Sequence, residues 1–183
     1  MKRHTIAFLI VLLPSLTFAQ VTNPASLAAR QYRQQHERAI LDEFVEMLRI
    51  PNVAADRENI LRNADYIVRM MQARGIAASQ VSVPKANPVV FGEIRTPGAQ
   101  RTIVFYAHYD GQPVDATQWK TPPFSPTLRN RSIESGGEVI PLPQPGISLD
   151  PKSRLYARGA GDDKVPIIAM MSALDAIRST SAK

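Results

Sequence analysis

One short segment of this sequence pairs a histidine with an acid at a spacing suited to chemistry. His108 is followed two residues later by Asp110, directly after the apolar run 102–107. Residues i and i+2 of an extended chain point to the same side, so the Asp110 carboxylate can accept a hydrogen bond from one imidazole nitrogen of His108. That bond would fix the tautomer and leave the other nitrogen free for a metal ion. Taken alone, the segment is equally well explained by a structural histidine beside a surface acid.

A second segment places two adjacent acids after a turn of small residues. Asp162 and Asp163 follow the Gly-rich run 157–161 and stand where a helix is expected to begin. A single aspartate at such a place would favour helix capping, because it satisfies free backbone N–H groups and the helix dipole. Two acids, with the histidine segment upstream, shift the interpretation towards a metal site in which one carboxylate bridges two cations. Arg158 and Lys164 flank the pair and could balance its charge when metal is absent.

Helices and strands are expected in an order that would position both segments. Apolar residues at helical spacing predict helices over 25–49, 57–74 and 165–179, with Gly75 capping the second. Short β-prone runs predict strands near 81–83, 89–94 and 155–157. The run 102–107 is almost continuously apolar, which is typical of a central strand buried on both faces. The proline-rich stretch 110–153 is either a functional loop or carries short strands.

This order indicates an α/β fold, a mixed β-sheet flanked by helices. In open α/β sheets, ligands bind beyond the carboxyl ends of the strands. We therefore expect His108 to project into such a crevice rather than into the core.

Composition and charge exclude several classes of protein. The 183 residues are 44% hydrophobic and 21% charged, an ordinary globular balance, and the absence of cysteine excludes disulfides and thiolate ligands. The net charge of +6 is dispersed among acids rather than gathered on one face, so nucleic acid is not an expected partner.

The N-terminus predicts export. A basic start, an apolar run over residues 5–18 and small residues before Ala19 are typical of a signal peptide spanning residues 1–19. The run is too short for a spanning helix, so we expect no stable membrane anchor. The mature domain would be 20–183, periplasmic or secreted.

The two segments resemble a known family of zinc peptidases and amidohydrolases. Residues 108–114 match its H-x-D-x-x-P-V segment, residues 119–126 its W…P-F-x-P stretch, and residues 155–164 its L-Y-G-R-G-x-x-D-D-K segment. The family includes acetylornithine deacetylases, succinyl-diaminopimelate desuccinylases, aminoacylases, carnosine-type dipeptidases and glutamate carboxypeptidases. Ala157 and Val165 replace two usual glycines, and an insertion falls at about 131–153.

The resemblance implies roles for three residues. His108 would bind one zinc ion, Asp162 would bridge two, and Asp110 would be the active-site acid that orients His108. The side chains of His108 and Asp162 would then converge on the same cation from the ends of neighbouring strands. The bond between Asp162 and Asp163 would be cis. Zinc is the expected metal, with cobalt or manganese as alternatives. The substrates would be dipeptides or N-acyl amino acids.

The resemblance also implies that the chain is the N-terminal part of a catalytic domain. The family carries its paired glutamates, including the general base, and its remaining ligands well after the D-D-K segment. A second, smaller domain often pairs subunits, so a homodimer is a possible form of the complete enzyme. We expect the isolated chain to be inactive. The alternatives are a non-catalytic, exported metal- or ligand-binding domain of the same fold, and a structural or interaction domain.

Overall fold

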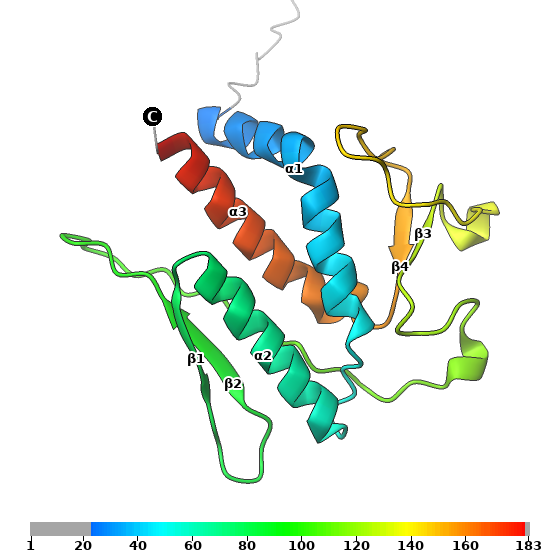
Figure 1. Ribbon diagram of the computed structural model, residues 1–183, viewed down its shortest axis with the longest axis horizontal. Helices are drawn as coiled ribbons and strands as arrows, with labels where there is room; N and C mark the ends of the chain where they lie inside the picture. Colours follow the sequence, from blue (N-terminus) through cyan, green and yellow to red (C-terminus); the bar gives the residue numbers. More distant parts are fainter. Residues whose placement is uncertain (1–22, 182–183) are drawn as a thin grey trace, which may run out of the picture.

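The computed structural model describes residues 23–181, in which three helices form the centre of the fold (Figure 1). They are α1 (Pro24–Arg49), α2 (Arg57–Ala73) and α3 (Val165–Ser181). Side-chain oxygens of Asn23 and Asp56 accept backbone N–H groups at the starts of α1 and α2, and Pro24 occupies a first-turn position that needs no N–H. The three helices that the apolar spacing predicts are thereby confirmed, and Gly75 follows α2 in the expected left-handed conformation (φ 65°).

The strands form two small antiparallel sheets rather than one. β1 (Ala77–Val81) pairs with β2 (Val89–Glu93), and β3 (Thr127–Arg129) pairs with β4 (Arg154–Tyr156). Figure 1 shows the β1–β2 hairpin beside α2 and the β3–β4 pair on the far side of α1. The proline-rich stretch carries β3 and two short 3₁₀ turns, Ala116–Gln118 and Ile133–Ser135. Helices with small sheets agree with the predicted α/β class.

The core lies where α1, α2 and α3 meet. α1 packs along α3, while α2 packs against β1 and β2. Met47, Leu48 and Ile60 are fully buried. The wider cluster of buried apolar residues comprises Phe44, Met47, Leu48, Ile67, Met70, Ile76, Ala157, Ile167, Ile168 and Met171.

One guanidinium connects all three helices. Arg74, at the end of α2, places Nη2 2.8 Å from Oε2 of Glu43 on α1 and Nε 2.8 Å from Oδ2 of Asp175 on α3. The Arg74 side chain is only 15% exposed, so the solvent screens these ion pairs weakly. Hydrogen bonding to Glu43 is the largest cause that raises the pKa of Arg74 above its ordinary value, which favours the charged form.

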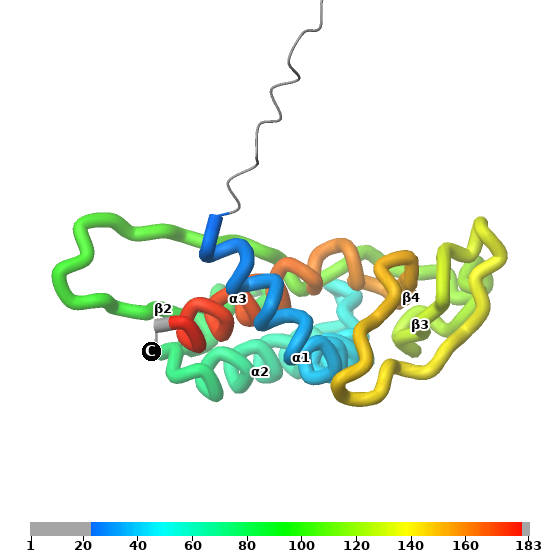
Figure 2. The backbone as a smooth tube through the Cα atoms, turned by 90° about the horizontal axis from the view of Figure 1, so that it is seen from above, coloured from blue at the N-terminus to red at the C-terminus, as the bar shows by residue number. Residues whose placement is uncertain are grey.

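The prediction of a buried central strand over 102–107 is wrong for this structure. The segment forms no strand, and Ile103, Val104, Phe105 and Tyr106 are between 71% and 85% exposed. In Figure 2 the chain after β2 runs out in a wide loop before it returns. The physical reason is that a strand needs neighbours for its N–H and C=O groups, and within residues 23–181 no backbone hydrogen bond pairs this segment.

The predicted signal peptide, residues 1–19, lies outside the described residues. Within the part of the chain that the structure describes, none of the helices combines the length and the apolar character needed to cross a membrane.

Candidate metal site

The structure brings His108 and Asp162 into direct contact. Nε2 of His108 lies 3.0 Å from Oδ1 of Asp162, although the two residues are 54 positions apart. Asp162 lies in the irregular turn Ala160–Lys164 between β4 and α3, and His108 follows the unpaired segment 102–107. The two side chains therefore lie close together, but the prediction that they follow neighbouring strands of one sheet is wrong.

The distance between the two side chains suits a shared cation. Imidazole nitrogen and carboxylate oxygen bind zinc at about 2.0–2.2 Å, so two ligands at a tetrahedral angle stand roughly 3.3 Å apart. The observed 3.0 Å needs an adjustment of only a few tenths of an ångström. The pair is accessible to an ion, since His108 is 38% and Asp162 77% exposed. One nitrogen and one carboxylate form a donor set suited to zinc, cobalt or manganese.

Asp110 lies beside the other ring nitrogen, mainly through its backbone. Nδ1 of His108 is 2.9 Å from the Asp110 carbonyl oxygen and 3.4 Å from the carboxylate Oδ1, so the carbonyl is the nearer acceptor. A proton on Nδ1 donated to that carbonyl leaves Nε2 directed at Asp162. The main chain of Asp110, and not the carboxylate that the sequence suggested, therefore makes the closer contact with the imidazole.

The surroundings of His108 favour positive charge. Its pKa is raised above the ordinary value, first by the hydrogen bond to the Asp110 carbonyl and then by the charges of Asp163, Asp162 and Asp110, while burial acts in the opposite direction. Three carboxylates around one imidazole stabilise a proton on it when no metal is present. The same field would attract a divalent cation.

Asp163 holds the histidine segment by its side chain. Its Oδ2 accepts the backbone N–H of His108 at 3.2 Å and lies 4.0 Å from Nε2. The peptide bond between Asp162 and Asp163 is cis, as the resemblance predicts. Two adjacent acids thus differ in placement: Asp162 faces the imidazole and solvent, and Asp163, 25% exposed, anchors the backbone.

Lys164 does not balance the acidic pair as the sequence suggested. Its side chain is fully buried, and Nζ donates to the carbonyls of Met47 at 2.8 Å and Ile50 at 2.9 Å, at the end of α1. Burial lowers the pKa of Lys164 to about 7. The reason for the difference is that α1 ends with free carbonyl groups that need donors, which an ammonium supplies.

Asn52 is a second buried polar residue that sequence reasoning missed. It is 0% exposed, and its Nδ2 donates to the Tyr109 carbonyl oxygen at 3.1 Å. A single asparagine after Ile50-Pro51 carries no chemical signal in the sequence. Its position between two glycine-containing segments becomes evident only in three dimensions.

The described residues contain no complete cluster of metal-binding side chains. Across residues 23–181, no group of three or more His, Cys, Asp or Glu side chains is arranged to hold a metal ion.

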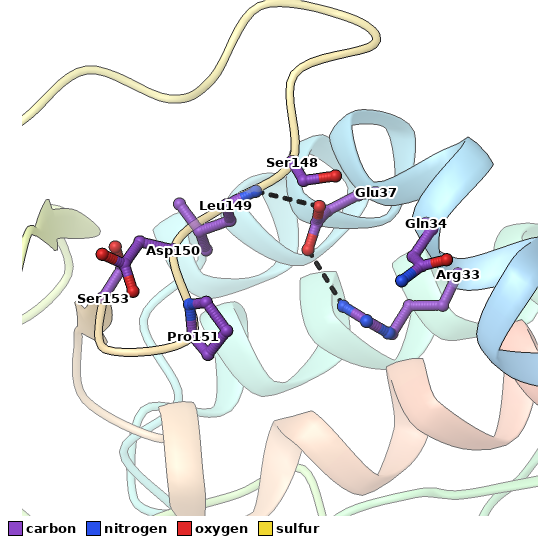
Figure 3. A pocket seen from close by; sticks show the side chains of 8 residues that line it. All are labelled: Arg33, Gln34, Glu37, Ser148, Leu149, Asp150, Pro151 and Ser153. Atoms are coloured by element: carbon purple, nitrogen blue, oxygen red, sulfur yellow. Dashed lines mark hydrogen bonds and ion pairs between the residues drawn. The ribbon is translucent and has the colours of Figure 1, made fainter.

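A hollow of about 370 Å³ lies away from His108 and Asp162, between α1 and the loop 148–153. Figure 3 shows Glu37 at one side of this hollow, where its carboxylate pairs with the Arg33 guanidinium and accepts the backbone N–H of Leu149. It contains neither His108 nor Asp162.

Comparisons with known proteins identify metallodipeptidases as relatives. The chain is 31% identical over 153 residues to the Cys-Gly metallodipeptidase dug1 of Schizosaccharomyces pombe, covering 74% of this chain and 28% of the relative. It is 24% identical over 201 residues to the Beta-Ala-His dipeptidase of Homo sapiens, covering 98% of this chain and 34% of the relative.

A solved structure of the dipeptidase Dug1p of Saccharomyces cerevisiae shares the fold, with a TM-score of 0.65 at 19% identity over 85% of this chain and 31% of that one. No protein-family model matches the chain. By these coverages, the chain spans about a third or less of the length of the three relatives. The relatives confirm the predicted resemblance to the metallopeptidase family.

Proposed function

This chain is a homologue of the metallodipeptidases, and from that premise we propose that it is the N-terminal part of a di-zinc hydrolase cleaving dipeptides. N-acyl amino acids, whose amide bond has the same chemistry, are the second substrate class. The observation that carries the proposal is the 3.0 Å contact between His108 Nε2 and Asp162 Oδ1 at the two segments that match the family.

The proposed roles follow from the contacts. His108 would supply one imidazole nitrogen to the metal site, and Asp162 would supply both of its carboxylate oxygens. Asp110 and Asp163 would orient the histidine through its ring nitrogen and its backbone N–H. A bound metal pair would lower the pKa of a water molecule and polarise the scissile carbonyl. The general base that takes the water's proton would come from outside residues 23–181.

Three observations support the proposal that further chain completes the site. The relatives are about three times as long as the matched region. Segment 102–107 presents unpaired backbone and large apolar side chains, which a neighbouring strand and a covering layer would bury. The metal-binding side chains of the described residues do not amount to a full set. Together these would make the chain one layer of a larger α/β domain.

Export is a separate part of the proposal and rests on residues 1–19 alone. The cleaved domain would work in the periplasm or outside the cell. Assembly of the complete enzyme as a homodimer is proposed by resemblance only.

Activity assays test the proposal on a polypeptide of the relatives' full length that contains this chain. Hydrolysis of Cys-Gly, β-Ala-His and an N-acetyl amino acid would be measured with zinc, cobalt or manganese. Loss of a residue that merely orients a metal ligand costs about 10–100-fold, so His108→Ala and Asp162→Ala should each lower kcat/KM by more than about 100-fold. His36→Ala is the matched control, because His36 is exposed on α1 and its Nδ1 lies 2.9 Å from the Tyr32 carbonyl oxygen, one turn earlier in the same helix.

Two results would contradict the proposal. Full activity of the His108→Ala variant would remove the metal site from its assigned place. Metal-dependent dipeptide hydrolysis by residues 20–183 alone would show that the chain is not a fragment. Tight metal binding without hydrolysis by the long polypeptide would instead favour a non-catalytic binding domain.

A further inference from the structure

Asn52 lies between the two loops that carry the proposed ligands. It is fully buried, and its Nδ2 donates to the Tyr109 carbonyl, one residue after His108. On its other side it meets Gly159, three residues before Asp162. A Cβ atom at Gly159 would stand 2.8 Å from Asn52 Nδ2. No side chain larger than hydrogen therefore fits at Gly159 while Asn52 keeps its place.

The backbone of Asn52 pairs with the same histidine loop. Its carbonyl accepts the Gly111 N–H at 2.6 Å, and the Gly111 carbonyl accepts the Ala54 N–H at 2.8 Å. These two bonds form a parallel bridge between Val53 and Gly111. A Cβ at Gly111 would also stand 3.1 Å from Asn52 Nδ2. The histidine loop is thus held at two points, by the main chain and by the side chain of one residue.

The segment that carries Asn52 is itself fixed from two directions. Lys164, two residues after Asp162, donates to the carbonyls of Met47 and Ile50 just before it. Asn63 on α2 donates to the Pro51 carbonyl at 2.8 Å. Because Lys164 belongs to the turn of the aspartates, both ligand loops are attached to the stretch 47–54. A change in this stretch would move one loop relative to the other.

We propose that Asn52 is a positioning residue that sets the distance between the His108 loop and the Asp162 loop, and so permits one cation to bind both. The inference rests on the proposed function, because it assumes that both side chains bind the same ion. Metal–ligand distances tolerate only about 0.2 Å, so a small relative shift of the loops weakens shared binding. The amide of Asn52 acts through packing and one hydrogen bond, and it touches neither ion nor substrate.

Tyr66 on α2 provides a control outside the stretch 47–54. Its hydroxyl donates to the Glu43 carbonyl oxygen at 3.0 Å, as Asn52 Nδ2 donates to the Tyr109 carbonyl oxygen at 3.1 Å. Tyr66→Phe therefore removes one hydrogen bond to a backbone carbonyl, as Asn52→Ala does. Tyr66 belongs neither to the two ligand loops nor to the stretch that joins them.

The test is a Co²⁺ titration of the chain followed by two-dimensional ¹H–¹⁵N NMR. In the natural chain the amide signals of both loops should broaden with one common dissociation constant, because one paramagnetic ion lies next to both. In Asn52→Ala that constant should rise about tenfold, the lower end of the effect of losing an orienting contact. The Tyr66→Phe variant, measured where both variants are folded, should keep the natural constant. Asn52→Ser, which retains a donor, should lie between the two and replaces the alanine variant if that variant does not fold.

The outcomes separate this inference from the proposed function. Separate dissociation constants for the two loops in the natural chain would overturn both, since no ion would be shared. A common constant that stays unchanged in Asn52→Ala and Asn52→Ser would leave the shared site intact and overturn the positioning role. An equal loss in the Tyr66→Phe variant would also overturn it, because general destabilisation would then account for the effect.

Discussion

Replacing Arg74 should destabilise the fold more than replacing a residue of an exposed ion pair. The Arg74→Met variant keeps much of the side-chain volume and removes the guanidinium that pairs with Glu43 and Asp175. The two carboxylates would remain, only 25% and 24% exposed, without their cation. A hydrogen bond to a charged group is worth about 1.5–3 kcal/mol, and partial exposure reduces this. We expect a loss of about 2–4 kcal/mol in the free energy of unfolding.

The assay is urea denaturation followed by circular dichroism at 222 nm, with the slope of the transition compared between variants. Arg33→Met is the matched control. Arg33 pairs with Glu37 one turn along α1 and is 57% exposed, so its loss should cost less than about 0.5 kcal/mol. Equal effects of the two substitutions would refute the view that Arg74 holds the three helices together. A double variant with Glu43→Gln should lose less than the sum of the single effects, because the two residues share one interaction.

Three further predictions address the core, the unpaired segment and the N-terminus. Burial raises the pKa of Tyr66 to about 12, so the contribution of Tyr66 to stability should be complete below about pH 10, its ordinary pKa, and be lost as the pH rises towards 12. In unfolding measurements Tyr66→Phe should therefore lose less stability over this range than the natural chain. Tyr109, whose pKa burial also raises to about 12, should account for part of the loss that remains. In denaturation experiments Leu48→Ala, at a fully buried site, should cost about 2–5 kcal/mol, whereas Val104→Ala, at a position 84% exposed, should change the isolated chain by less than about 0.5 kcal/mol. Mass spectrometry of the chain expressed in an exporting bacterium should find a mature N-terminus at Gln20, and an intact N-terminus would contradict export.

The helices were predictable because their signals are local. Apolar spacing, the caps at Asn23 and Asp56 and the glycine after α2 all lie within or next to the element they define. The segment 102–107 shows the opposite case. Its apolar composition is typical of a strand that lies between two other strands. Such pairing depends on segments far away in the sequence, and residues 23–181 supply no strand that pairs with this one.

The sequence predicted that His108 and Asp162 lie close together, but the structural reason for this differs from the predicted one. Residue types and spacing pointed to His108 and to the pair Asp162 and Asp163, and the family resemblance singled out Asp162. The structure brings His108 and Asp162 to 3.0 Å. Adjacent strand ends were the expected cause, whereas the stretch around Asn52 joins the two loops. The direction of the Lys164 side chain was not predictable, because an ammonium beside two acids has an obvious local partner. Its actual partners lie at the end of α1, more than 110 positions earlier.

Crystals of the chain soaked in Zn²⁺ and measured at the zinc absorption edge would test the central claim most directly. The account predicts an anomalous peak within about 2.2 Å of both His108 Nε2 and an Asp162 carboxylate oxygen. A zinc ion bound to other side chains, with the imidazole and that carboxylate still joined only to each other, would contradict it.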